Sequence, residues 1–264
     1  MPRMRLDRLL VHRGLAPSRE KARARIMAGE VLVDDEPVAK AGALVAEDAE
    51  VRLRGDGCPY VSRGGVKLAG ALKAFELEPR GLVCADIGAS TGGFTDCLLQ
   101  RGAARVHAVD VGYGQLAYEL RTDPRVVVHE RVNARNLTDL GEAVDLVVVD
   151  VAFISLRLIL PACDAILVDG GRVICLVKPQ FEAGRSEVGK GGVVKDKAVH
   201  ARVVGEVARV GGGVGLAPSD VCASPIEGPA GNREFFLLLR KGGRAAADLE
   251  ERIRGAVEDG EGAT

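Results

Sequence analysis

The chain has 264 residues, of which 47% are hydrophobic and 28% are charged. This length accommodates one large domain, or one medium and one small domain, with the composition of a soluble globular protein. The formal net charge of −1 excludes a uniformly basic nucleic-acid binder, so any basic surface must be confined to single segments.

The first fifty or so residues have the pattern of two short helices followed by strands. Gly14 is placed to end the first helix, Ser18 can cap the second, and Gly29 is placed to end it. We expect helices over 6–13 and 19–27, a strand over 31–33, a turn over 34–37 and further strand over 45–53.

These two helices concentrate positive charge. Residues 1–30 hold eight basic and three acidic side chains, which leaves a net charge of +5. Arg19 with Arg23, and Lys21 with Arg25, are spaced i, i+4 and so share a helix face. Such a face is the usual footprint of a nucleic-acid binder, although it can also be an ordinary solvated surface. The candidate RNA-binding residues are Arg5, Arg8, Arg19, Lys21, Arg23 and Arg25.

The same segment resembles a known RNA-binding module. An Arg-Leu-Asp start, Ser18-Arg-Glu-Lys-Ala22 and Gly29-Glu-Val-Leu-Val-Asp34 are similar to the S-four-type domain over residues 4–50. The resemblance implies that the helix pair binds structured RNA.

A run of chain breakers, Arg54-Gly-Asp-Gly-Cys-Pro59, separates this module from the rest of the chain. We therefore expect an RNA-binding domain over 1–55, a linker over 56–62 and a second domain over 63–264. The second domain begins with a helix that reaches Phe75 and carries Lys67 near its start.

Strands and helices alternate in the second domain. Strand-like runs lie at 82–86, 105–110, 126–130, 145–150, 171–177, 219–224 and 234–240. Helical stretches lie near 93–101, 115–120, 137–143, 155–166, 196–210 and 244–257. This alternation predicts an α/β fold with a parallel sheet and helices on both of its faces.

The first strand of this domain runs from Leu82 to Asp86 into a glycine-rich loop. Such a loop either cradles a cofactor or simply connects a strand to a helix. Asp110 ends the next strand, where a carboxylate can accept hydrogen bonds from ribose hydroxyls. The loop lacks the second glycine of Gly-x-Gly-x-x-Gly, which disfavours a nicotinamide dinucleotide and hence an oxidoreductase.

The sequence Asp-x-Gly-x-x-x-Gly-Gly-Phe instead resembles the first motif of S-adenosylmethionine-dependent methyltransferases. The resemblance implies that the loop faces the methionine portion of the cofactor, Asp110 its ribose, and Val111 its adenine. The implied cofactor-binding residues are Asp86, Gly88, Ser90, Thr91, Gly92, Gly93, Phe94, Asp110, Val111 and Gly112.

Four charged residues form the candidate catalytic set: Lys67, Asp150, Lys178 and Glu234. Asp150 and Lys178 each end an apolar strand, where the burial of an unpaired charge is costly. Each residue alone could be part of a structural ion pair. Together they indicate a site that can deprotonate a weakly acidic hydroxyl, with a lysine as base and the carboxylates orienting the lysines.

Lysine, aspartate, lysine and glutamate in this order resemble the tetrad of heat-shock-type (FtsJ-like) ribose 2′-O-methyltransferases. With Tyr60-Val-Ser-Arg-Gly-Gly, Asp150-Val-Ala-Phe-Ile-Ser, Lys178-Pro-Gln-Phe-Glu and Ser224-Pro-Ile-Glu-Gly, the chain resembles the TlyA family, which is also called haemolysin. Some members of that family carry Trp where this chain has Tyr60.

That resemblance implies a Rossmann-like sheet with an antiparallel last strand. It also implies methyl transfer from S-adenosylmethionine to a cytidine 2′-hydroxyl of 16S or 23S ribosomal RNA, or both, with ribosomal RNA or subunits as partner. Lys178 would be the base, Lys67 and Glu234 would flank the acceptor ribose, and Asp150 would lie between cofactor and acceptor. Additional basic contacts to RNA are expected from Arg63, Lys73 and Arg135.

Other functions fit the sequence less well. No metal site is expected, because the six cysteines include no Cys-x-x-Cys pair and the four histidines are scattered. A haemolysin that acts on membranes needs an apolar span, whereas the most apolar window, 143–160, contains three charged residues. An RNA-binding protein without catalysis would not need all four charged positions. Without a signal peptide pattern, we expect a cytoplasmic protein.

Overall fold

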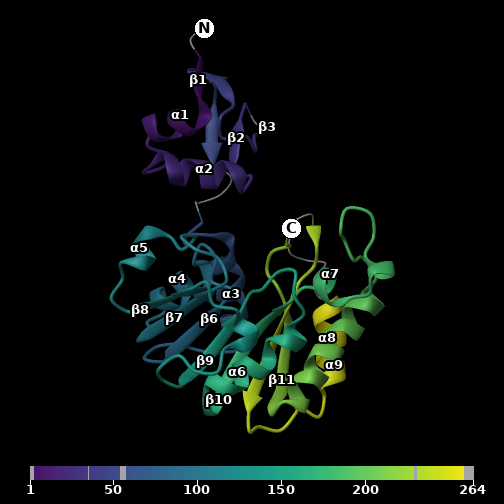
Figure 1. The fold of residues 1–264 in the computed structure, drawn as a ribbon. Helices are drawn as coiled ribbons and strands as arrows, with labels where there is room; N and C mark the ends of the chain where they lie inside the picture. The colour runs from purple at the N-terminus through teal and green to yellow at the C-terminus, as the bar shows by residue number, and fades with distance from the viewer. Residues whose placement is uncertain (1–2, 35, 54–57, 229–230, 259–264) are drawn as a thin grey trace. The chain divides into compact units, whose positions relative to one another are not determined.

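The computed structural model describes residues 3–34, 36–53, 58–228 and 231–258 (Figure 1). The chain separates into two compact units, Met1–Pro59 and Tyr60–Thr264. Residues 54–57 lie outside the described part of the chain, and they include the first two residues of the predicted linker over 56–62. Residues 60–62 belong to the second unit.

The first unit packs two helices against short antiparallel strands. Its elements are β1 (Arg3–Arg5), α1 (Leu6–His12), α2 (Arg19–Met27), β2 (Val31–Val33), β3 (Glu36–Pro37), β4 (Leu44–Ala46) and β5 (Val51–Leu53). Strand β1 pairs with β4, and β2 lies between β3 and β5. As predicted, Ser18 caps α2, its hydroxyl accepting a hydrogen bond from the Lys21 backbone N–H.

Two predictions for this unit were wrong. Part of the predicted turn over 34–37 is strand, because β3 returns to pair with β2. The single strand over 45–53 is two strands, since residues 47–50 form a turn. The Asp34 carboxylate accepts from the Glu50 backbone N–H (2.9 Å), and the Arg13 guanidinium donates to the Ala49 carbonyl (2.8 Å), so this turn is held from both sides.

The second unit contains a seven-stranded sheet in the order β11-β12-β10-β9-β6-β7-β8. The strands are β6 (Val83–Ile87), β7 (Arg105–Asp110), β8 (Val126–Glu130), β9 (Val144–Val149), β10 (Leu167–Val177), β11 (Leu216–Ala223) and β12 (Phe235–Lys241). Strands β6 to β10 are parallel, and β12 is antiparallel to both of its neighbours. The predicted mostly parallel sheet with an antiparallel last strand is therefore confirmed.

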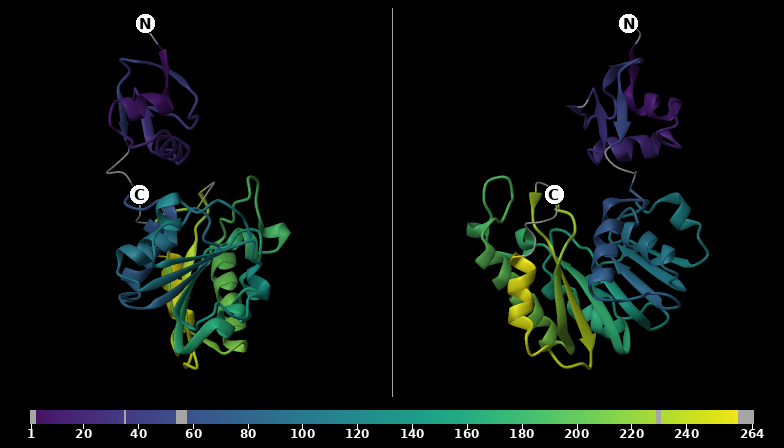
Figure 2. Two further views of the ribbon diagram at one scale, coloured as in Figure 1. Left: turned by 60° about the vertical axis from the view of Figure 1, so that its left-hand side comes forward. Right: turned by 180° about the vertical axis from the view of Figure 1, so that it is seen from behind.

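Helices cover both faces of this sheet (Figures 1 and 2). They are α3 (Arg63–Ala74), α4 (Gly93–Gln100), α5 (Tyr118–Arg121), α6 (Leu160–Ile166), α7 (Pro179–Glu182), α8 (Lys197–Gly213) and α9 (Leu249–Glu258), with 3-10 turns at Ala134–Asn136, Leu156–Leu158 and Arg185–Glu187. Buried side chains of α6, α8 and α9 join one core cluster, and those of α3 and α4 join the other.

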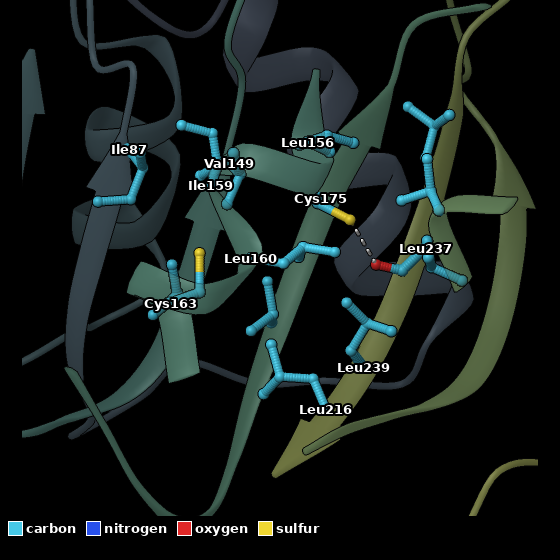
Figure 3. Packing of buried hydrophobic residues seen from close by; sticks show 14 of the residues in the cluster. Ile87, Val149, Leu156, Ile159, Leu160, Cys163, Cys175, Leu216, Leu237 and Leu239 are labelled. Carbon is cyan, nitrogen blue, oxygen red and sulfur yellow. Dashed lines mark hydrogen bonds between the residues drawn. The ribbon is translucent and has the colours of Figure 1, made fainter. Parts of the chain in front are cut away.

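The first of these clusters is shown in Figure 3, where Leu156, Leu160 and Leu237 surround Cys175. The Cys175 thiol donates a weak hydrogen bond to the Leu237 carbonyl (3.7 Å), and its burial keeps its pKa well above the ordinary value. The thiols of Cys84, Cys97, Cys163, Cys175 and Cys222 are free. Alternation along β6 sends Cys84 to one cluster and Ala85 to the other, which is the pattern of a strand buried on both faces.

Two helix predictions for this unit were wrong. No helix forms over 137–143, where Gly141 adopts a φ of 86° and its N–H donates to the Asp139 carboxylate in a turn. The stretch 155–166 is not one helix, since a 3-10 turn precedes α6, whose first turn contains Pro161. In the described part of the chain, no helix is both long enough and apolar enough to cross a membrane.

Candidate active site

A cavity of about 320 Å³ lies at the carboxyl ends of the parallel strands, where ligands of such sheets bind. The loop after β6 forms part of its wall, and the ends of β9 and β10 contribute Asp150 and Lys178. The predicted residues that line this cavity are Lys67, Asp86, Gly88, Ser90, Thr91, Gly93, Phe94, Asp150 and Lys178. Residues far apart in the sequence are thus brought to one place.

The four predicted catalytic residues form two ion pairs. Lys178 Nζ lies 2.5 Å from Asp150 Oδ1, and Lys67 Nζ donates to Glu234 Oε2 at 2.5 Å. The side chains of Lys178 and Asp150 are 13% and 23% exposed, whereas that of Glu234 is only 1% exposed. The first pair can therefore be reached from solvent through the cavity, and the second is deeper.

The Lys67–Glu234 pair joins helix α3 to the residue that precedes β12. Because both groups are buried, removing one would leave an uncompensated charge. Gly228 leaves room for the carboxylate, since a Cβ at that position would lie 2.2 Å from Glu234 Oε1. The lining of the cavity includes Lys67 but not Glu234, so Glu234 acts on the cavity through Lys67.

Asp86 is fully buried at the end of β6. Its Oδ2 accepts from the Thr95 hydroxyl (2.7 Å) and backbone N–H (2.9 Å), which fixes the carboxylate at the start of α4. Its Oδ1 has no hydrogen-bond partner among the residues that the structure describes. Burial raises the pKa of Asp86 to about 7. A buried, unpaired acceptor that lines a cavity fits a positively charged ligand, such as the ammonium or sulfonium of S-adenosylmethionine.

The glycines of the loop after β6 are required by close contacts. Gly88 has a φ of 87°, and a Cβ there would lie 2.4 Å from the Asp150 carbonyl oxygen. Gly92 has a φ of 97° and caps α4, where a Cβ would lie 2.3 Å from the Leu120 side chain. Gly88 therefore allows the loops of β6 and β9 to meet beside the cavity, and Gly92 allows α4 to begin.

A second cavity, of about 550 Å³, adjoins the first and shares Gly88, Ser90 and Asp150 with it. It is also lined by Asp110 and Val111. The two oxygens of Asp110 accept from the backbone N–H groups of Ser90 (2.8 Å) and Gly112 (2.7 Å). Since a carboxylate oxygen can accept more than one hydrogen bond, Asp110 retains capacity for hydroxyl donors.

Two predicted cofactor residues lie at the margin of this arrangement. Gly112 lines a smaller recess together with Asp110, and a Cβ there would lie 2.3 Å from the Gln115 amide nitrogen. Gly92 caps α4, as described above. Gly92 and Gly112 therefore shape the backbone beside the two cavities, whereas the other predicted cofactor residues line them.

Several cavity residues were missed by sequence reasoning. Gln115 follows β7, and Asn133 and Ala134 follow β8, at the same edge of the sheet. The rule that ligands bind beyond the carboxyl ends of parallel strands could have found them. Phe153 follows β9 and is 91% exposed at the wall of the second cavity.

The candidate RNA-binding arginines of the first unit differ in their surroundings. Asp7 is completely buried and accepts hydrogen bonds from Arg5 (2.9 Å) and Arg19 (3.2 Å), which lower its pKa to about 2. Arg25 donates to the Leu15 carbonyl (2.8 Å). Arg8 and Arg23 also have exposed side chains, and Lys21 is half-buried. The basic candidates of the first unit therefore include charges that hold the fold, through Asp7 and the Leu15 carbonyl.

The additional basic candidates lie in the second unit. Arg63 lines the first cavity and donates to the Glu227 carbonyl (2.7 Å), while Arg135 lines the second cavity. Lys73 is exposed on α3. Among the described residues, no cluster of three or more histidine, cysteine or acidic side chains is arranged to hold a metal ion.

Known proteins resemble both units of the chain. Residues 60–241 match the FtsJ-like methyltransferase family, and residues 4–51 match the S4 domain. The 16S/23S rRNA (cytidine-2′-O)-methyltransferase TlyA of Mycobacterium tuberculosis is 49% identical over 98% of both chains. The protein YqxC of Bacillus subtilis is 47% identical over 97% of this chain and 93% of its own.

A solved structure from Streptococcus thermophilus is 42% identical to this chain and has a TM-score of 0.77. The match covers 97% of this chain and 95% of that one, so it includes both units.

Proposed function

Because this chain belongs to the FtsJ-like methyltransferases and, within them, to the TlyA family, we propose that it methylates the ribose 2′-hydroxyl of a cytidine in ribosomal RNA. The observation that carries the proposal is the pair of lysine–carboxylate contacts in a cavity that adjoins a second, nucleoside-sized cavity. The named M. tuberculosis relative acts on 16S and 23S rRNA, and we propose the same substrate class for this chain.

S-adenosylmethionine supplies an activated methyl group on a positively charged sulfur. The residues that would hold it line the two adjoining cavities. Asp86 offers its unpaired Oδ1 to the positive charge, and Asp110 offers its carboxylate to the ribose hydroxyls. Val111, which is 73% exposed, offers an apolar surface for the adenine.

The acceptor hydroxyl would bind in the first cavity, against Lys178. Lys178 Nζ, in its neutral amine form, is the group placed to take the hydroxyl proton and become an ammonium, and Asp150 orients it through their 2.5 Å contact. Lys67, held by Glu234, places an ammonium in the same cavity and stabilises the developing negative charge on the acceptor oxygen. The rate gain comes chiefly from alignment, since the reacting atoms must be held in line.

The first unit would anchor the RNA. Its S4 domain carries exposed Arg8 and Arg23, and RNA phosphates are the natural partners of such side chains. Arg63 and Arg135, which line the two cavities, and Lys73, which is exposed on α3, would add further contacts to the RNA. The partner we propose is therefore ribosomal RNA, free or within a ribosomal subunit.

The test is methyl transfer from radiolabelled S-adenosylmethionine to small and large ribosomal subunits that lack the modification. We expect label in one or both RNAs, and mass spectrometry of the digested RNA should place the methyl group on a cytidine ribose. Lys178→Ala should abolish transfer while cofactor affinity stays within about twofold of the original value. A methyl group on a base, or full turnover by Lys178→Ala, would overturn the proposed mechanism.

A further inference from the structure

The segments that follow β9 and β10 run side by side and contact each other at three successive points. Asp150 pairs with Lys178 at 2.5 Å. Phe153 packs on Phe181, with ring centroids 5.0 Å apart. Further along, Ser155 and Leu156 both donate hydrogen bonds to Glu182. The two catalytic side chains therefore stand at the beginning of a longer contact between these segments.

Glu182 makes the most directional of these contacts. Its Oε2 accepts from the Ser155 hydroxyl at 2.7 Å, and its Oε1 accepts from the Leu156 backbone N–H at 2.7 Å. Both oxygens of one carboxylate are thus used by the opposite segment. Burial raises the pKa of Glu182, and the hydrogen bonds from Ser155 and Leu156 oppose this rise because they favour the ionised carboxylate.

Neither segment is held by long regular secondary structure of its own. Helix α7 is one turn long, and helices this short are marginal without tertiary contacts. In the other segment, Phe153 has a φ of 62°, a conformation that residues other than glycine rarely adopt. The Asp150–Lys178 pair is itself partly exposed to solvent. A restraint outside the pair is therefore needed to fix its position.

We propose that Glu182 is a positioning residue, which ties residues 155 and 156 to α7 and thereby holds Lys178 against Asp150 in the geometry that proton transfer requires. This inference rests on the proposed function, because the proton transfer belongs to that reaction. It assigns Glu182 no contact with cofactor or RNA. It predicts that a change at Glu182 slows the chemical step and leaves binding intact.

The test compares Glu182→Ala with Glu182→Gln. The alanine variant loses both hydrogen bonds, whereas glutamine keeps an acceptor for the Leu156 N–H and an amide that can donate to the Ser155 hydroxyl. In single-turnover methylation of ribosomal subunits, we expect Glu182→Ala to be slower by roughly ten- to hundredfold, as misplaced catalytic groups are. Glutamine should restore most of the rate. The Kd values for S-adenosylmethionine and RNA should change by less than about twofold in both variants.

Glu187 provides a matched control. It is a nearby carboxylate that accepts from the Gly184 N–H (2.9 Å) and pairs with Arg202 (2.6 Å), so its contacts lie within 184–202. Glu187→Ala should turn over at the original rate. Ser155→Ala removes one of the two bonds to Glu182 and should give an intermediate rate, which keeps the proposal testable if Glu182→Ala does not fold.

The outcomes separate this proposal from the proposed function. If the unchanged protein does not methylate ribose, the proposed function fails, whatever Glu182 does. If the unchanged protein is active and Glu182→Ala has the same rate, or loses cofactor affinity together with rate, Glu182 is not a positioning residue. Failure of glutamine to restore the rate would also overturn the proposal.

Discussion

Asp7 on α1 and Arg19 on α2 are joined by a hydrogen-bonded ion pair of 3.2 Å, in which the aspartate is completely buried. Arg5 binds the same carboxylate from β1 at 2.9 Å. Reversing the charge of Arg19 would therefore place two carboxylates together inside the first unit. A loss of RNA binding in such a variant would not separate a direct contact from a damaged fold.

Arg8 and Arg23 provide a cleaner test of RNA binding, because both side chains are exposed. We expect Arg8→Ala with Arg23→Ala to weaken RNA binding and leave thermal unfolding unchanged. Each lost phosphate contact should lower the slope of log K against log salt by roughly 0.7 to 0.9. Binding titrations at several salt concentrations measure this slope. The control is Arg209→Ala, which removes an exposed charge from α8 and should leave the slope unchanged. If the slope is also unaltered in the double variant, Arg8 and Arg23 do not contact RNA.

Asp7→Asn should reduce RNA affinity although it removes a negative charge from a basic surface. The reason is that Asp7 fixes the guanidinium groups of Arg5 and Arg19, which would otherwise lose order before they meet RNA. We expect a loss of about fivefold, which is about 1 kcal/mol, the usual net scale for one hydrogen bond. The control is Glu20→Gln on α2, an exposed acid whose removal should raise affinity slightly. Tighter binding by both variants would show that Asp7 acts only as a charge.

Cofactor affinity should depend on pH through Asp86. Since its pKa is raised to about 7 by burial, the carboxyl is largely protonated at pH 6 and largely ionised at pH 8. A cationic ligand favours the ionised form, so affinity for S-adenosylmethionine should rise about tenfold over this range, with release of up to about one proton on binding. Calorimetry in two buffers of different ionisation enthalpy counts that proton. The Asp86→Asn variant should bind S-adenosylmethionine more weakly, and its affinity should no longer rise between pH 6 and pH 8. If the variant keeps the same dependence of affinity on pH, Asp86 is not the source of that dependence.

Gly228→Ala should impair catalysis without touching the cavity directly. The added Cβ would lie 2.2 Å from Glu234 Oε1, so the carboxylate must move away from Lys67. We expect turnover to fall by roughly tenfold or more, because the Lys67 ammonium loses its fixed position. Cofactor affinity, measured separately, should stay close to the original value. Gly213→Ala is the control, since a Cβ there meets nothing within 4 Å; equal rates for the two variants would contradict the role given to Gly228.

The order of elements in the second unit could be predicted from the sequence because its strands are apolar and end on polar residues. Asp150 and Lys178 were found in this way, and the neighbouring strands β9 and β10 place them together. The antiparallel β12 followed from family resemblance, since alternation alone does not give strand direction. The helix predicted over 137–143 failed because local turn chemistry at Asp139 and Gly141 prevailed.

The contacts of Asp7 and Glu182 could not be predicted, for a common reason. Besides Arg5, two residues away, Asp7 binds Arg19, which lies 12 residues away on another helix, and the partners of Glu182 lie 26 and 27 residues away. Sequence spacing identifies neighbours within one helix or strand, but these pairs depend on the paths of the chain between elements. Only the folded structure brings such side chains together.

The position of β12 between β10 and β11 has a consequence for the newly made chain. Glu234 follows Lys67 by 167 residues, so a ribosome must synthesise all of the intervening chain before the buried lysine meets its partner. Until then β10 has a free edge, and the sheet lacks an interior strand. Translation that stops before residue 234 would leave an unfinished sheet and a lysine without its carboxylate, and such a fragment should be inactive and prone to aggregate. The proposed active site is thus complete only once β12 has been synthesised.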